Sequence, residues 1–155
     1  MSKIRILFIH FGTELYGSDR ILIDILGFWQ NSAEVSLMVP GDGLLIDMLK
    51  ERKINATLIY NKNMPIISRN IFKKHNFALF IRNYFYTRKI MNSLKYDILY
   101  INTLACAIFL LYKKSVKIIH IHEILVNRLQ IIIFGAKCFI IAPNMMICNL
   151  LTNIS

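Results

Sequence analysis

Polar side chains follow three short apolar runs of this sequence, at the points where buried strands are expected to end. They are His10 after the first run, Asn102 and Thr103 after the second, and His122 and Glu123 after the third. Because parallel strands present their carboxyl ends at one edge of an open sheet, where ligands bind, we expect these groups to lie close together. A neutral imidazole can donate or accept a hydrogen bond near pH 7, which makes His122 the strongest candidate for acid–base chemistry. Buried groups that merely cap helices would give the same pattern.

A glycine-bearing loop follows the first expected strand. Its sequence is Phe11-Gly-Thr-Glu-Leu-Tyr-Gly-Ser-Asp-Arg20, and Ser18 is the expected N-cap of the helix that follows. Glycine lets a backbone approach a ligand, and a helix N-terminus offers free amides to an anion, so Gly17 and Ser18 are candidate phosphate-binding residues. The loop is not a P-loop, because Ser18-Asp19 stands where Lys and Ser or Thr are required. A turn that only caps the helix is the alternative.

Two histidines in the third run have the spacing of a metal pair. His120 and His122 share one face by the two-residue period of a strand. Only Glu123 is close enough in sequence to add a carboxylate, and it points to the other face if the strand continues. We therefore expect no metal site, and we expect His120 and His75 to be structural.

The elements that must position these groups alternate along the chain. Strands are expected at residues 4–9, 34–39, 56–60, 98–101, 116–121 and 139–142, and helices at 18–29, 44–52, 71–94 and 103–112. Such alternation predicts a mostly parallel sheet of about six strands with right-handed crossovers, in a Rossmann-like three-layer α/β/α fold over residues 1–155. The first run is apolar on both sides, so its strand belongs at the centre.

The composition limits the classes of protein that fit. The chain has 155 residues, of which 55% are hydrophobic and 18% charged, so a disordered chain is excluded and little polar surface is available. Cys106, Cys138 and Cys148 have no disulfide or metal spacing, and the N-terminus carries no secretion signal, so we expect a cytoplasmic protein. The uncharged stretch 138–155 is interrupted by Pro143 and three asparagines, which argues against a transmembrane helix.

The net charge of +10 arises in one segment. Between Arg52 and Tyr96 there are ten basic residues and no acidic one. The basic helix interleaves cations with aromatic rings, which suits peripheral attachment to the anionic inner face of the cytoplasmic membrane. The candidate membrane-surface residues are Lys73, Lys74, Arg82, Arg88 and Lys89. Two alternatives are a helix whose aromatic side chains pack on the sheet, and a nucleic-acid binder; no nucleic-acid partner is expected, because no recognition motif accompanies the charges.

Four segments occur in a fixed order along the chain: Lys3–His10, Tyr16–Arg20, Asp97–Thr103 and His120–Ile124. Together they resemble the N-terminal, acceptor-side domain of family 4 glycosyltransferases of the GT-B fold, and Val39-Pro-Gly-Asp-Gly-Leu-Leu45 fits the second strand and turn of that domain. The resemblance implies two Rossmann-like domains that face each other across a cleft. The first binds mainly the acceptor, a glycan or lipid-linked sugar, and the second binds the nucleotide-sugar donor. Transfer in that family is typically retaining and needs no metal or other cofactor.

The resemblance also implies roles for individual residues. The turn at Gly17 would lie against the donor phosphates, His122 would contact the transferred sugar, and Asn102 and Thr103 would line the acceptor side. Ser18, His10 and Glu123 complete the expected substrate-binding set. The sequence has no Asp-x-Asp motif, which agrees with a GT-B enzyme rather than with a metal-using GT-A enzyme.

The departures from the family pattern concern the donor side. No acidic residue follows Glu123, whereas the donor domain of the family carries two glutamates seven residues apart. Ala142-Pro143-Asn144 also replaces the serine usual after the sixth strand. We therefore expect a truncated chain, or half of a split enzyme with a separate donor-domain chain, that transfers sugar poorly alone. The alternative is a non-catalytic α/β binding module or a decayed remnant that binds acceptor or membrane only.

Overall fold

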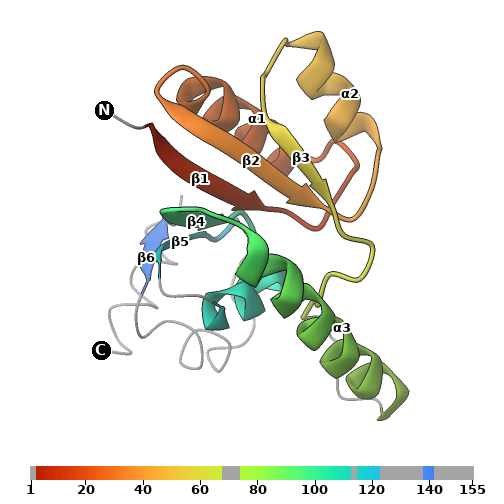
Figure 1. Ribbon diagram of the computed structural model, residues 1–155. Coiled ribbons are helices and arrows are strands. Elements are labelled where there is room, and N and C mark those ends of the chain that lie inside the picture. Colours follow the sequence, from red (N-terminus) through yellow and green to blue (C-terminus); the bar gives the residue numbers. More distant parts are fainter. Residues whose placement is uncertain (1–2, 68–73, 113–114, 123–137, 142–155) are drawn as a thin grey trace.

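The computed structural model describes residues 3–67, 74–112, 115–122 and 138–141. Six strands and four helices alternate along this part of the chain (Figure 1). In chain order they are β1 (Ile4–Ile9), α1 (Gly17–Trp29), β2 (Ala33–Val39), α2 (Leu44–Glu51), β3 (Thr57–Tyr60), α3 (Lys74–Ser93), β4 (Ile98–Ile101), the 3-10 helix η1 (Leu104–Leu111), β5 (Val116–His120) and β6 (Phe139–Ile141).

The strands form one parallel sheet in the order β3-β2-β1-β4-β5-β6. The strand order therefore reverses between β1 and β4, the switch point at which open α/β sheets bind ligands. Ile9, the last residue of β1, pairs in register with Ile101, the last residue of β4, and Ile101 pairs with Ile119. The register thus brings the carboxyl ends of β1, β4 and β5 to the same level of one edge.

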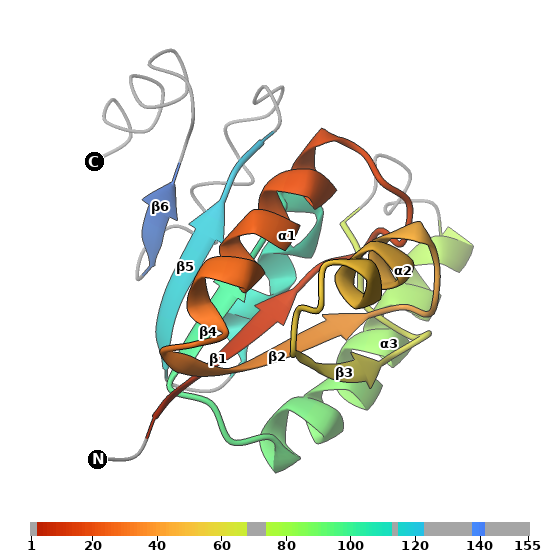
Figure 2. The same ribbon diagram turned by 90° about the horizontal axis from the view of Figure 1, so that it is seen from above.

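Helices α1 and α2 cover one face of the sheet (Figure 2). They bury residues at helical spacing, Leu22, Ile23 and Leu26 on α1 and Leu45, Ile46 and Leu49 on α2. These side chains pack with Ile6 and Phe8 of β1 in one hydrophobic core. Because β1 also buries Leu7 and Ile9 in the core of the opposite face, it lies between two apolar layers, which explains its continuous apolar sequence.

Helix α3 and η1 cover the second face. Tyr84 of α3 stacks on Tyr112 at a centroid distance of 5.0 Å, and Met91 is fully buried. Thr87, also fully buried, accepts a hydrogen bond from Asn61 Nδ2 at 2.8 Å and so ties α3 to the end of β3. The aromatic residues of α3 are divided between two faces: Phe80 and Tyr84 pack on the core, whereas others are exposed.

The predicted fold class is confirmed: this is a Rossmann-like α/β/α fold with an all-parallel six-stranded sheet. Two local expectations were wrong. Helix α1 begins at Gly17 with Tyr16 as its N-cap, not Ser18, because the Asp19 carboxylate accepts the Tyr16 backbone N–H at 2.7 Å. The expected α-helix at 103–112 is a 3-10 helix, with Cys106 N–H bonded to the Thr103 carbonyl. It is buried on nearly every side, so tertiary packing decides its form.

Within the described ranges, no helix is both long and apolar enough to cross a membrane. Cys106 is buried and Cys138 is partly buried. Burial raises the pKa of Cys138, which keeps the thiol protonated at neutral pH. Cys148 lies outside the described residues, and the side chain of His75 is not described.

Candidate functional site

His10 and Asp19 form a buried polar pair where β1 gives way to the loop before α1. His10 Nε2 lies 2.6 Å from Asp19 Oδ1, and both side chains are at most 3% exposed. Asp19 lies in the first turn of α1, where its other oxygen holds the Tyr16 N–H and Oδ1 receives the Ser18 hydroxyl at 3.3 Å. The carboxylate thus links the end of the central strand to the start of the first helix.

Asn102 connects this pair to β5. Its Nδ2 donates to His10 Nδ1 and to the Ser18 carbonyl oxygen, both at 3.2 Å, and its Oδ1 lies 3.2 Å from His122 Nε2. A backbone carbonyl can only accept, so Ser18 fixes which end of the Asn102 amide faces it. It follows that His122 carries a proton on Nε2, and that His10 accepts at Nδ1 and carries its proton on Nε2, toward the carboxylate.

His120 and His122 lie side by side at the end of β5, as their spacing predicted. Their ring centroids are 3.9 Å apart, and the Tyr100 hydroxyl lies 2.8 Å from His120 Nδ1. Burial, with a smaller contribution from the His122 charge, lowers the pKa of His120 from 6.5 to about 4. Burial also raises the pKa of Tyr100 to about 12, so His120 and Tyr100 are neutral at pH 7. His122 is only half-buried and is the more accessible ring.

A metal site needs several His, Cys, Asp or Glu ligands. Among the residues that the structure describes, no group of three His, Cys, Asp or Glu side chains could hold an ion. In the neutral Nε2–H form of His122, Nδ1 is an acceptor. An imidazole in this position can hydrogen-bond to a ligand hydroxyl or take part in proton transfer.

The other predicted residues lie around this network. Thr103 is 2% exposed, and its hydroxyl has no hydrogen-bond partner among the described residues. Gly17 is exposed at the start of α1, and a Cβ there would meet nothing within 4 Å. Ser18 contributes its carbonyl to Asn102 and its hydroxyl to Asp19. Glu123 lies outside the described residues.

Close packing holds the loop after β1 in place. A Cβ on Gly12 would lie 3.0 Å from His10 Nε2, so this glycine allows the loop to pass the His10 ring. A Cβ on Gly43 would clash with the Thr13 carbonyl oxygen. That oxygen accepts the Leu45 N–H at 3.0 Å, so the start of α2 supports the loop. The loop after β1, which leads to the Asp19 end of the network, is therefore braced by packing against His10 and the start of α2.

Two members of the network were not singled out from the sequence. Asp19 reads as an ordinary acidic residue in a first helical turn; its place three residues after Tyr16 is a capping-box position and was the available signal. Tyr100 lies two residues before Asn102 and so shares its face of β4, which the strand period indicates. Neither signal shows that the side chain reaches a histidine on another element.

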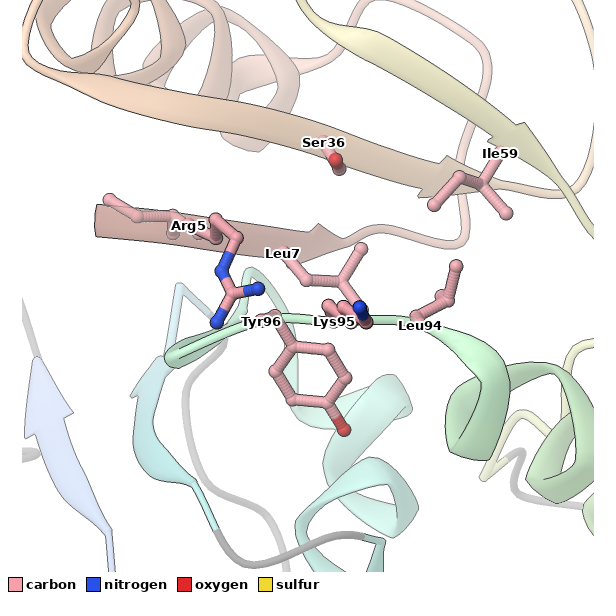
Figure 3. Close-up of a pocket in the computed structure, with 8 residues that line it drawn as sticks. Arg5, Leu7, Ser36, Ile59, Leu94, Lys95 and Tyr96 are labelled. Atoms are coloured by element: carbon pink, nitrogen blue, oxygen red, sulfur yellow. The ribbon is translucent and has the colours of Figure 1, made fainter. Parts of the chain in front are cut away.

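A small cavity lies at a different part of the sheet and does not include this network (Figure 3). It is lined by Arg5, Ile6, Leu7, Ser36, Ile59, Leu94, Lys95 and Tyr96. Arg5 is already paired with Asp97 at 2.8 Å, near the amino ends of β1 and β4. The mostly apolar lining and the paired cation make this cavity a weaker candidate than the carboxyl ends of the strands.

The architecture is that of one Rossmann-like half of a GT-B protein. Solved structures of HepE (Alr3699) from Anabaena, a glycosyltransferase of the GT-B type, share it. Against the HepE complex with UDP and glucose, the identity is 17% and the TM-score 0.64, and the match covers 98% of this chain and 41% of that chain. The complex with UDP-glucose gives 17% identity and a TM-score of 0.62 over 98% of this chain and 41% of HepE.

The similarity to HepE is a similarity of fold, and this chain spans 41% of the length of HepE. It supports a glycosyltransferase-like fold and does not distinguish family 4 from other glycosyltransferase families. No family profile and no curated protein matches the sequence.

Proposed function

We propose that this chain is the acceptor-side half of a glycosyltransferase that uses a nucleotide sugar. The observation that carries the proposal is the buried chain of polar groups from Asp19 through His10 and Asn102 to His122, at the switch point of a GT-B-like sheet. HepE has been solved with UDP, glucose and UDP-glucose, which supports a nucleotide sugar as the donor. The acceptor is a glycan or a lipid-linked sugar.

In this proposal, His122 contacts the transferred sugar. Asn102 Oδ1 accepts a hydrogen bond from His122 Nε2 and so fixes the ring that hydrogen-bonds to a sugar hydroxyl. Thr103, with a buried hydroxyl that no described residue engages, lines the acceptor side. The start of α1 at Gly17 and Ser18 faces the donor phosphates, where free amide groups favour an anion. Glu123 adjoins His122 in sequence and completes the substrate-binding set.

The donor-binding wall belongs to a second domain or a separate chain. Transfer then proceeds with retention and without a metal. A cleft with both walls orients the reactants and excludes water, and one wall alone does neither. We therefore expect the 155-residue chain to bind sugar ligands weakly and to transfer sugar poorly.

NMR titration of the isotopically labelled chain with UDP-glucose tests the proposal. We expect saturable shifts at His122, Asn102 and Thr103, with a dissociation constant of about 1 mM because one wall is missing. His122→Ala should abolish the shifts at Thr103, whereas Lys50→Ala, on an exposed part of α2, should leave them unchanged. Shifts that appear with a glycan but not with UDP-glucose would refute the contact between His122 and the transferred sugar and would assign these residues to the acceptor alone. No shift at these three residues with either ligand would refute the site.

A further inference from the structure

The outward-facing side of α3 exposes an apolar surface. Five large apolar residues of this helix are between 38% and 56% exposed: Phe77, Leu79, Ile81, Phe85 and Tyr86. Phe77, Ile81 and Phe85 follow one another at intervals of four, so they form one stripe about 12 Å long. Met91, by contrast, points to the sheet and is fully buried.

Cations border this stripe. Arg82 follows Ile81, and Arg88 and Lys89 lie one helical turn beyond Phe85; all three are exposed. Of the other two cations predicted for a membrane surface, Lys73 lies outside the described residues and Lys74 is the first residue of α3. We call the stripe and its three cations the outer face of α3.

The outer face carries charge of one sign only. From Arg52 to Tyr96 the sequence has no acidic residue. The ion pairs between Arg or Lys and a carboxylate in the described part of the chain use Arg5, Lys50 and Arg52, none of which belongs to α3. A surface with exposed rings and unneutralised cations is complementary to one that is uniformly anionic and apolar beneath its charge, as a bilayer of acidic phospholipids is.

Helix α3 connects β3 to β4 across the sheet. Strand β3 ends at Tyr60, at the carboxyl edge of the sheet, and α3 returns the chain to the amino end of β4 (Figure 1). The first turns of α3 project away from the sheet, and its last turn lies near the start of β4 (Figure 1).

We propose that the outer face of α3 docks on an anionic phospholipid bilayer. Phe77, Ile81 and Phe85 enter the headgroup boundary, and the three cations bind lipid phosphates. This docking does not depend on the proposed transferase function, since it uses none of the residues of the strand-end network. Failure of one proposal leaves the other standing.

Vesicle flotation of the full chain provides the test. We expect binding to an equal mixture of phosphatidylcholine and phosphatidylglycerol, little binding to phosphatidylcholine alone, and release at about 0.5 M NaCl. The double variant Arg88→Glu/Lys89→Glu should lower the partition coefficient about thirtyfold or more, since each cation near an anionic surface contributes about 1 kcal/mol. The matched control is Lys50→Glu/Lys53→Glu, which makes the same charge change at the C-terminal end of α2 and just after it and should lower partitioning less than about threefold.

A second variant separates insertion from simple charge attraction. Phe77→Ser/Phe85→Ser keeps every cation and should still lose most of the binding, with circular dichroism confirming the fold. Equal binding to neutral vesicles, equal losses for the two charge-reversed doubles, or full binding by the serine double would each overturn the proposal. Preferential binding to single-stranded nucleic acid over anionic vesicles would also overturn it and would assign the basic helix to a different partner.

Discussion

His120 is expected to make the stability of the chain fall as the pH drops from 7 to 5. The ring is 7% exposed, and its folded pKa of about 4 lies well below the value of about 6.5 expected for the unfolded chain. Between these two values the unfolded state binds a proton that the folded state excludes, so stability decreases with decreasing pH and levels off below pH 4. The shift corresponds to about 3 kcal/mol in full and to about 2 kcal/mol between pH 7 and pH 5.

Urea unfolding at pH 7, 6 and 5 measures this effect. Other groups also titrate in this range, so the informative quantity is the difference between the wild type and His120→Gln. Glutamine cannot titrate and can still hydrogen-bond to the Tyr100 hydroxyl. We expect the wild type to lose about 2 kcal/mol more than the variant between pH 7 and pH 5.

Tyr100→Phe supplies the control, because it removes the hydroxyl and retains the ring that packs near His120. It should lower the free energy of unfolding by about 1 kcal/mol at both pH values without changing the slope. Equal pH slopes for the wild type and His120→Gln would show that the burial of this ring is not what excludes the proton.

Three further substitutions, the first with a matched control, probe the loop after β1 and the hydrogen-bond network. The Cβ of Gly43→Ala would clash with the Thr13 carbonyl, so this substitution should lower the free energy of unfolding by about 2 kcal/mol or more. Gly41→Ala has open space around its Cβ and should change the free energy of unfolding by less than about 0.5 kcal/mol. Equal changes in melting temperature for the two variants would contradict this. Asn102→Leu removes the three hydrogen bonds of the Asn102 side-chain amide and should lower the free energy of unfolding in urea by about 3 kcal/mol. A loss below about 1 kcal/mol would mean that the network is dispensable for folding. Thr103→Val should leave the free energy of unfolding unchanged or raise it slightly. A decrease of about 2 kcal/mol would reveal a hydrogen-bond partner of the Thr103 hydroxyl.

Much of the fold could be predicted because a parallel sheet leaves a simple pattern in the sequence. The strands β1 and β4 are buried on both faces and read as short apolar runs, and the predicted bounds of all six strands agree with the structure to within one residue over the described range. The proximity of His10, Asn102 and His122 followed from the same rule, since the register of parallel strands forces their carboxyl ends together. Their roles in binding stay predictions.

The partners of these residues could not be predicted, because they depend on contacts between elements. The Asp19 carboxylate accepts a hydrogen bond from the Tyr16 N–H, so Tyr16 and not Ser18 is the N-cap of α1. Asp19 can be buried because His10, at the end of β1, pairs with it. Likewise, the division of the α3 aromatic residues between core and surface depends on where η1 lies. Tyr84 packs because Tyr112 is there to stack on it, which the spacing along α3 alone does not reveal.

The contact between Gly43 and Thr13 limits how the chain can vary in length. Exposed turns usually tolerate insertions, since their backbone is solvated and their ends can shift. Here the Leu45 N–H is bonded to the Thr13 carbonyl, and an added residue in the turn 40–43 would move the start of α2 away from it. The turn before α2 and the loop after β1 therefore form one unit of restricted length, although α1 and β2 separate them in the sequence. Homologous chains that keep the His10 network are expected to vary in length elsewhere.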